Sequence, residues 1–320
     1  MKNLLDITIL IPVFNEYESL KTLNDEIVSS IPSEYKYEII YINDGSSDDS
    51  INILKDIYKK NNNVRIINFY KNRGKSEALN IGFKKSSGNI VITLDADLQD
   101  DPKEIPNLIK EINSGFDMVS GWKKNRKDPF DKTFPSKIFN FVLRRLSGIK
   151  IHDFNCGIKA YKKHVVKTIN IYGGLHRFIP ILVKNNGFSV SEIIVNHRQR
   201  KFGFSKYGKS RLFDGAYDLI TVLFLKKYLN KPLHLFGKWG IVFSVLGLCI
   251  NLFLTWQWLL FNFFQEGLKY SINRPLLFFG ILLLVVGIQF VSIGLIGELI
   301  VFFNKRNKYL TDNNEYINFS

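Results

Sequence analysis

The sequence predicts an α/β domain with a mostly parallel sheet, followed by amphipathic helices and two membrane-spanning helices. Short runs rich in β-branched residues alternate with helical patterns over roughly the first two thirds of the chain. Two long stretches without a charged residue follow near the C-terminus. The 320 residues are 46% hydrophobic, which is enough for a sizeable core and excludes wholesale disorder.

The predicted sheet rests on four strand-like runs separated by helical segments. The runs are ITILIPVF, YEIIYIND, VRIINFY and NIVITLDAD, and helices are expected from about Ser19, from about Ser47 and near Ser76. Strands that alternate with helices of this length form parallel sheets with right-handed crossovers. Such Rossmann-like sheets bind ligands beyond the carboxyl ends of their strands, so we expect the functional site at that edge.

Polar clusters follow the predicted strands at this edge. They are Asn15-Glu16, Asn43-Asp44-Gly45, Asn72-Arg73-Gly74-Lys75 and Asp95-Ala96-Asp97. A carboxylate there can accept hydrogen bonds from a base or from ribose hydroxyls, and Gly45 allows the backbone to approach a ligand closely. The segment NDGSSDDS also suits an ordinary turn followed by a helix N-cap, and taken alone it leaves both interpretations open.

Asp95 and Asp97 are the candidate metal ligands. They follow the strongest predicted strand, and strand alternation points both side chains to the same side. Two neighbouring carboxylates repel unless a cation lies between them, and hard oxygen ligands suit Mg²⁺ or Mn²⁺. Such a metal neutralises a departing diphosphate. Short Asp-x-Asp matches are common by chance, so the position at a strand end is what favours a functional site.

Two uncharged runs, 239–265 and 275–297, predict membrane spans. Each exceeds the roughly 20 residues that a helix needs to cross a bilayer. A pair of buried core helices is the alternative. Basic residues flank the outer ends of the pair, whereas the connecting loop holds only Lys269 and Arg274 against Glu266. By the positive-inside rule, both termini and the soluble domain are expected in the cytoplasm.

The predicted boundaries divide the chain into a soluble domain (1–210), interfacial amphipathic helices (211–235), a transmembrane hairpin (236–303, with spans at about 239–265 and 275–300) and a cytoplasmic tail (304–320). The segment before the spans mixes aromatic and aliphatic residues with lysines, which suits helices in the membrane interface. A helix packed on the soluble domain fits equally well. Glu298, near the end of the second span, is interpreted as an interfacial or helix-end group.

Charge and cysteine content narrow the partners. The formal charge of +15 fits nucleic acid, anionic lipid or phosphorylated substrates. A basic binding protein without enzymatic activity leaves the Asp-x-Asp pair unexplained, and no nucleic-acid-binding motif is present, so we predict a membrane lipid as partner and no nucleic acid. Cys156 and Cys249 lie far apart and outside any ligand pattern, which predicts reduced thiols and no structural zinc.

Four motifs, IPVFNE, NDGSSDDS, NRGKSEALNIGF and DADLQDDP, resemble those of the family 2 glycosyltransferases in order and spacing. More narrowly, residues 5–210 look like the polyprenyl-phosphate glycosyltransferases, which include dolichyl-phosphate mannose synthases and bacterial undecaprenyl-phosphate transferases. The C-terminal spans resemble the hairpin anchor of some members. The resemblance implies a GT-A catalytic domain that transfers a sugar, with inversion, from a nucleotide-sugar to a polyprenyl phosphate. Mg²⁺ or Mn²⁺ is the implied cofactor, and a UDP-sugar is slightly favoured over GDP-mannose.

The resemblance also implies roles for individual residues. The nucleotide-sugar is expected to contact Pro12, Phe14, Glu16, Ile42, Asp44, Lys75, Asp95, Ala96 and Asp97. The implied metal group is Asp95, Asp97 and Gln99, and the implied catalytic residues are Asp97, Asp153, Arg200 and Lys206. Ser136, Lys137, Asn140 and Arg144 are expected near the lipid phosphate, with a solvated basic helix face as the alternative.

The sequence departs from the family pattern at Trp122, where related enzymes commonly have arginine. Lys123, Lys124 and Arg126 are the candidates for the missing charge. Asp153 corresponds to an acid often proposed as a catalytic base. A phosphate monoester is largely dianionic at neutral pH, however, and its oxygen is already nucleophilic without a base. The alternative role for Asp153 is to orient the acceptor or a sugar hydroxyl.

Two further expectations remain open at this stage. His176 lies in the region that contacts the sugar in the family, and a structural histidine is equally expected there. A family 2 enzyme that acts on a polysaccharide or another glycan is the second enzyme hypothesis. Processive synthases carry a Q-x-x-R-W segment, whereas the comparable residues 197–200 read HRQR with no tryptophan following. The hairpin also offers a surface for a homo-oligomer.

Overall fold

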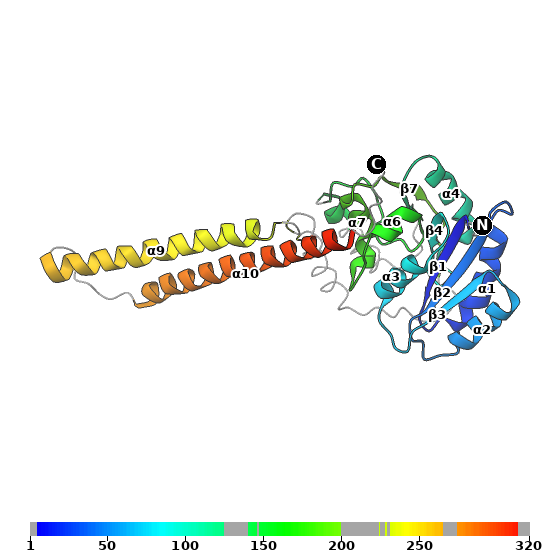
Figure 1. Cartoon of the computed structure of the whole chain (residues 1–320), viewed down its shortest axis with the longest axis horizontal. Helices are drawn as coiled ribbons and strands as arrows, with labels where there is room; N and C mark the ends of the chain where they lie inside the picture. The colour runs from blue at the N-terminus through cyan, green and yellow to red at the C-terminus, as the bar shows by residue number, and fades with distance from the viewer. Residues whose placement is uncertain are drawn as a thin grey trace. The chain divides into compact units, whose positions relative to one another are not determined.

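The computed structural model of the chain describes residues 5–124, 140–145, 147–199, 224, 228, 231–264 and 274–312 (Figure 1). The chain forms two compact units, Met1–Leu223 and Phe224–Ser320. The first contains the predicted α/β domain, and the second contains the two long apolar helices. Most of the segment predicted to form interfacial helices lies outside the described residues.

Within the described residues, a mixed sheet of seven strands forms the centre of the first unit, in the order β3-β2-β1-β4-β6-β5-β7. The strands are β1 (Ile7–Val13), β2 (Tyr37–Asn43), β3 (Val64–Asn68), β4 (Ile90–Thr93), β5 (Met118–Trp122), β6 (Lys159–Lys162) and β7 (Val190–Ile194). The first four are parallel neighbours, which confirms the predicted parallel sheet. β6 runs antiparallel to β4 and β5, so its first residue lies at the edge where the other strands end.

Helices cover both faces of this sheet. They are α1 (Tyr17–Ser30), α2 (Ser50–Lys60), α3 (Lys75–Lys85), α4 (Ile105–Asn113), α6 (Lys163–Thr168) and α7 (Ile179–Asn185), with short 3-10 helices η1 (Pro102–Glu104) and η2 (Leu175–Phe178). Ile9 and Ile11 of β1 pack with α1, α2 and α4 in one core, whereas Leu10 packs with α3, α6 and α7 in the other. The period-2 alternation of the strand therefore serves two buried faces.

Helix α2 begins three residues later than the sequence predicts, at Ser50 instead of about Ser47. The intervening residues dock onto the end of β1. The Ser47 N–H donates to Asn15 Oδ1 at 2.8 Å, and the Glu16 N–H donates to Ser50 Oγ at 3.0 Å. The segment 44–49 is therefore a structured turn that fixes the ends of β1 and β2 to each other.

The second unit contains α9 (Leu233–Phe264) and α10 (Arg274–Asp312), which lie side by side in Figure 1. Their apolar stretches, Leu233–Phe263 and Pro275–Phe303, are long enough to cross a membrane, and only 17% and 11% of their most apolar windows are buried. A core helix of a soluble protein is mostly buried, so the exposure favours membrane spans. Helix α10 also continues past the end predicted for the second span, into the predicted tail.

The two long helices approach each other through glycines. A Cβ atom on Gly240 would lie 2.7 Å from the carbonyl oxygen of Gly287, and one on Gly247 would lie 2.6 Å from that of Gly280. Such backbone proximity is typical of packing between membrane helices. Glu298 Oε2 lies 3.5 Å from the Leu233 N–H at the start of α9. This contact agrees with the predicted helix-end role of Glu298, since a carboxylate there also complements the helix dipole.

Candidate functional site

The carboxyl edge of the sheet brings together the polar clusters that follow β1, β2, β3 and β4. Asp44 is the buried centre of the β2 end. Its Oδ1 accepts from the Arg73 N–H at 2.7 Å, and its Oδ2 accepts from the Gly74 N–H at 2.9 Å. Burial raises the pKa of Asp44, against the lowering effect of these two bonds. Asp44 thereby holds the turn that presents Lys75, the first residue of α3.

Lys75 and Asp95 form an ion pair at the centre of the edge, with Lys75 Nζ 2.5 Å from Asp95 Oδ1. Burial alone would raise the pKa of Asp95. Lys75, together with Lys123 and Lys159, outweighs that effect and lowers the pKa to about 2. Asp95 is therefore ionised at neutral pH, and the nearby lysines give this edge a dense group of charges.

Asp100 and Lys123 form a buried ion pair beneath the Asp95 turn. Asp100 is fully buried, its Oδ2 accepts from the Asp95 N–H at 3.2 Å, and its Oδ1 lies 2.8 Å from Lys123 Nζ. Burial acts to lower the pKa of Lys123, but the Asp100 carboxylate outweighs it and raises that pKa. Of the two described candidates for the charge missing at Trp122, Lys123 and Lys124, Lys123 is therefore the one that reaches the Asp95 turn.

Trp122 itself forms an aromatic stack. Its ring lies 4.0 Å from that of His152, with 14° between the planes, and Lys124 Nζ lies 5.6 Å from the Trp122 ring centroid. The Glu192 carboxylate fixes His152 by accepting from its backbone N–H at 2.6 Å and by pairing with Nδ1 of the ring. Arg126, the third candidate for the missing charge, lies outside the described residues.

The segment before β6 passes directly against the carboxylates of Asp95 and Asp100. A Cβ atom on Gly157 would lie 2.4 Å from Asp100 Oδ2 and 2.6 Å from Asp95 Cγ, so only glycine fits there. Lys159 follows, is buried, and donates from Nζ to the carbonyl oxygen of Cys156. Burial, with the charge of Lys75, lowers the pKa of Lys159. Sequence reasoning missed Lys159, and it missed Asp100 although Asp100 lies in the DADLQDDP motif.

The predicted metal residues Asp97 and Gln99 lie on the turn that follows Asp95. Asp97 Oδ1 accepts from the Gln99 N–H at 3.2 Å, and both side chains are half-buried. Ala96 is buried and offers its carbonyl oxygen, which accepts from Ser19 Oγ at 2.6 Å. Leu98, which lies between Asp97 and Gln99, has a φ of 62°. The turn therefore presents two carboxylates and one amide at the edge.

This donor set fits a divalent cation that is shared with a substrate. The oxygen ligands of Asp95, Asp97 and Gln99 are the kind that Mg²⁺ and Mn²⁺ prefer. In the part of the chain that the structure describes, there is no group of three or more His, Cys, Asp or Glu side chains able to hold a metal. Mg²⁺ sites of one or two carboxylates usually take further ligands from phosphates and water.

His176 is held beside this edge by Ser76, the second residue of α3. Ser76 Oγ accepts from the His176 backbone N–H at 3.1 Å and lies 2.9 Å from His176 Nδ1. Burial, then the charges of Lys75 and Arg177, lower the pKa of His176 well below its usual range. The ring is therefore neutral at neutral pH.

The remaining predicted residues divide between the edge and the core. One narrow crevice is lined by Pro12, Lys75, Asp95, Asn155, Lys159 and His176. Phe14 and Glu16 are half-buried at the end of β1. Ile42, in contrast, is fully buried between the sheet and α3, so only its backbone reaches the edge.

The predicted acceptor residues are described only in part. Asn140 Oδ1 lies 3.4 Å from the Phe154 N–H, so Asn140 holds the segment that contains Asp153. Asp153 is buried, and its Oδ1 accepts from the Asn155 N–H at 3.2 Å. Arg144 is half-buried, and its Nε makes no hydrogen bond to the part of the protein that is described. Four predicted residues lie outside the described residues: Ser136, Lys137, Arg200 and Lys206.

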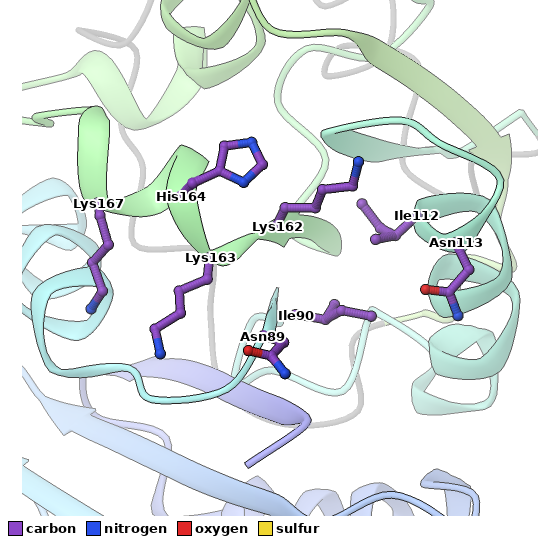
Figure 2. Close-up of a pocket in the computed structure, with 8 residues that line it drawn as sticks. All are labelled: Asn89, Ile90, Ile112, Asn113, Lys162, Lys163, His164 and Lys167. Atoms are coloured by element: carbon purple, nitrogen blue, oxygen red, sulfur yellow. The ribbon is translucent and has the colours of Figure 1, made fainter. Parts of the chain in front are cut away.

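An open hollow at the opposite edge of the sheet is also basic (Figure 2). Its lysines are engaged by the protein itself. Lys167 Nζ donates to the carbonyl oxygens of Phe83, Lys84 and Ser86 at 2.6, 2.9 and 2.9 Å. Lys163 Nζ donates to a backbone carbonyl oxygen at 2.9 Å, and Lys162 lies 3.2 Å from a carboxylate. We assign this cluster to structure, since its charges fasten loops and the end of α3.

A comparison with known families accounts for the arrangement at the carboxyl edge. Residues 8–169, about half of the chain, match Glycosyl transferase family 2. The chain belongs to this family. The four motifs that resemble family 2 glycosyltransferases therefore led to the right family. Each of them contributes residues to the charged edge described above.

Curated relatives extend the likeness over both units. Dodecaprenyl-phosphate galacturonate synthase of Rhizobium johnstonii is 33% identical over 302 residues, which cover 92% of this chain and 88% of that protein. Undecaprenyl-phosphate 4-deoxy-4-formamido-L-arabinose transferase of Yersinia pestis is 35% identical over 296 residues, with 92% and 88% covered. The resemblance to polyprenyl-phosphate glycosyltransferases is thus confirmed.

A solved structure shows the same fold. Glucosyl-3-phosphoglycerate synthase from Mycobacterium tuberculosis, in complex with Mn²⁺, uridine diphosphate and phosphoglyceric acid, has a TM-score of 0.55 and 17% identity. The likeness covers 69% of this chain and 78% of that one. It confirms the predicted GT-A fold of the first unit.

Proposed function

We propose that this protein is a membrane-anchored, metal-dependent, inverting glycosyltransferase that moves a sugar from a nucleotide-sugar to a polyprenyl phosphate. One observation carries the proposal. Two relatives named for dodecaprenyl phosphate and undecaprenyl phosphate align over 92% of the chain, a span that takes in both the charged edge and the apolar hairpin. Glycosyltransferases of other acceptors share the GT-A fold, so the fold alone does not select this acceptor.

The donor diphosphate is proposed to lie beside Lys75 and the Asp95 turn. Asp95, Asp97 and Gln99 would hold Mg²⁺ or Mn²⁺, which supplies positive charge that neutralises the departing diphosphate. The low pKa of Asp95, about 2, supports this role because it keeps the carboxylate ionised. The Mycobacterium tuberculosis enzyme of the same fold is solved with Mn²⁺ and uridine diphosphate, which supports a UDP-sugar as donor.

The remaining donor contacts are proposed from the same edge. The nucleoside lies among Pro12, Phe14, Glu16, Asp44 and the backbone of Ile42, since these residues lie at or just beyond the carboxyl ends of β1 and β2. Lys75 Nζ donates to diphosphate oxygens, and the neutral His176 ring forms a hydrogen bond to the diphosphate or the sugar. Arg200 and Lys206 are proposed to pair with the diphosphate, where fixed cations stabilise charge that develops during transfer.

The proposed reaction is a single displacement. An oxygen of the lipid phosphate forms a bond to the anomeric carbon while the bond from that carbon to the diphosphate breaks, and the nucleoside diphosphate leaves with the electron pair. One displacement inverts the configuration. The phosphate oxygen is already nucleophilic at neutral pH, and Asp153 is buried and bonded to its own segment. We therefore assign Asp153 an orienting role near the acceptor residues Ser136, Lys137, Asn140 and Arg144.

The proposed placement puts the soluble domain and both termini in the cytoplasm, with α9 and α10 as the membrane anchor and residues 211–235 at the interface. The basic residues outside the hairpin support this orientation. The glycines of α9 and α10 face each other, so a homo-oligomer of the hairpin would form through its outer, larger side chains.

Purified full-length protein with undecaprenyl phosphate, Mn²⁺ and a panel of radiolabelled nucleotide-sugars tests the function. We expect chloroform-soluble label that mild acid releases, since a sugar linked to a polyprenyl phosphate has both properties. Label in water-soluble polymer would favour the polysaccharide hypothesis. Hydrolysis of the donor without any labelled lipid would reject the acceptor assignment.

A further inference from the structure

Arg198 joins three separate segments next to the Asp97 turn. Its guanidinium contacts Glu26 of α1 through NH1, at 2.5 Å, and Asp101 through NH2, also at 2.5 Å. Its backbone N–H donates to the carbonyl oxygen of Gln99 at 3.0 Å. Arg198 and Asp101 are only 22% and 8% exposed at their side chains, so solvent screens their interaction weakly.

The turn that Arg198 contacts is held in a strained backbone conformation. Leu98 has a φ of 62°, in the left-handed region that residues with a Cβ avoid, and its side chain is buried. A single residue of this kind is unfavourable and persists only where the surrounding contacts hold it. Asp97 and Gln99, the proposed metal ligands, flank Leu98. The strained residue therefore lies between the two side chains that must point towards the metal.

Several other contacts also hold this turn in place. His197 pairs with Asp100 as an isolated antiparallel bridge, and Asn196 Nδ2 donates to Asp101 Oδ2 at 3.0 Å. On the opposite side, Ser19 of α1 donates to the carbonyl oxygen of Ala96 at 2.6 Å. Helix α1 thus contacts the turn directly through Ser19 and indirectly through Arg198.

We propose that Arg198 is a positioning residue that holds the Asp97–Gln99 turn in its strained form, so that Asp97 and Gln99 are oriented for the divalent cation. Arg198 acts through Gln99 and Asp101 and does not touch the substrate. The inference rests on the proposed function, since it assigns a purpose to the geometry of the same metal site. A bidentate guanidinium suits this task because its planar fork fixes two carboxylates at once.

The test compares Arg198→Met and Arg198→Lys with the wild-type protein, full length and in detergent. Direct Mn²⁺ binding in the presence of UDP is measured by electron paramagnetic resonance, and kcat and KM are measured for donor and polyprenyl phosphate. We expect Arg198→Met to weaken Mn²⁺ binding about tenfold, equivalent to about 1.4 kcal/mol. The KM for polyprenyl phosphate should not change, and Arg198→Lys should restore part of the Mn²⁺ affinity.

Arg65→Met is the matched control. Arg65 NH1 lies 2.7 Å from Glu38 Oε2 in a similar ion pair at the opposite edge of the sheet. This variant should lose thermal stability without any loss of Mn²⁺ affinity. If Arg198→Met resembles Arg65→Met, with a lower Tm but wild-type Mn²⁺ affinity, Arg198 is only structural and the inference is wrong. If the wild-type protein itself binds no Mn²⁺ with UDP, the proposed metal dependence fails first.

Discussion

The two edges of the sheet use charge in different ways. At the edge where the parallel strands begin, Glu38 and Asp117 are each satisfied locally by neutral donors and one cation. Glu38 accepts from Thr8 Oγ1 at 2.8 Å and from the Ser87 N–H at 2.7 Å, and it pairs with Arg65. Asp117 accepts from Ser189 and Lys162 in the same manner. These contacts join loops to strands.

At the carboxyl edge, in contrast, buried charges share partners. Asp95 lies near Lys75, Lys123 and Lys159, while Asp100 takes Lys123 as its cation. Taking several charged groups out of water is expensive, and well-packed apolar residues often stabilise a protein more. Folding alone therefore does not explain this group. Concentrated, perturbed charges are typical of functional sites, and the difference between the edges identifies which one does the chemistry.

The largest expected effect separates the edges by activity. Asp97→Asn should lower sugar transfer by at least about a thousandfold, because an amide does not supply the charge that a divalent cation needs. Asp117→Asn, at the opposite edge, should keep wild-type kcat and KM. Both are measured with radiolabelled donor in detergent. Near wild-type turnover in Asp97→Asn would show that Asp97 does not hold a catalytic metal.

Much of this contrast was predictable from the sequence. Strand order along the chain and the polar clusters after the strands placed Asp44, Lys75, Asp95 and Asp97 at one edge, because parallel strands end together. The burial of Lys123 was not predictable. Its neighbour Lys124 is the same residue type, and only the pairing of β5 with β6 turns one of them towards Asp100.

Other features depend on contacts between distant segments. Trp122 stacks on His152, thirty residues later in the chain, and a single sequence carries no signal for that pairing. Gly157 fits against Asp95 and Asp100 only because β6 is inserted antiparallel between β4 and β5. The Arg198 contacts to Glu26 and Asp101 likewise join residues far apart in sequence. Motifs therefore identified the residue types at the site, whereas tertiary pairing decided which of them are buried.

The two edges should also differ in how much stability they lose when a cation is removed. Lys123→Met leaves the fully buried Asp100 without its cation and should lower the free energy of unfolding by about 3 kcal/mol or more. Arg65→Met should lower it by only about 1 kcal/mol, because Glu38 keeps its bonds to Thr8 and Ser87. Urea denaturation, monitored by the unfolding of the first unit, measures the free energy of unfolding of both variants. The double variant Lys123→Met with Asp100→Asn should recover part of the loss, and equal losses in the two single variants would contradict the contrast.

The pH dependence of stability tests the opposite edge. Burial acts to raise the pKa of Asp117, but bonds from Ser189 and Lys162 outweigh it and lower the pKa to about 2. Its unfolded pKa is about 3.9, so its stabilisation is complete above that pH and is lost as the pH falls towards about 2.

Asp117→Asn should therefore be less stable than the wild type near pH 6, and the difference should shrink between about pH 4 and about pH 2. Denaturant midpoints at a series of pH values measure it. Asp95 also has a pKa of about 2. It is present in both the wild type and the variant, so its effect on stability cancels in the difference between them. A difference that stays constant with pH would contradict the assignment to Asp117.

The smallest expected effect concerns Lys167, which binds the last carbonyl oxygens of α3. Lys167→Met should lower the free energy of unfolding by about 1 kcal/mol, since one charged donor is lost at the helix end. The affinity for the donor should not change, because Asp44 fixes the other end of α3 through Arg73 and Gly74. Thermal denaturation and donor titration measure the two quantities, and a weakened donor affinity would show that the edges are coupled through α3.

The central claim is that the charged carboxyl edge binds a nucleoside diphosphate through a divalent cation. Calorimetric titration of UDP, and in parallel of GDP, into the full-length wild type, Asp97→Asn and Asp117→Asn tests it directly. We expect Mn²⁺ to strengthen binding of one nucleotide by at least about tenfold in the wild type and in Asp117→Asn, and not in Asp97→Asn. Binding of both nucleotides that is independent of Mn²⁺, or an undiminished Mn²⁺ effect in Asp97→Asn, would contradict it.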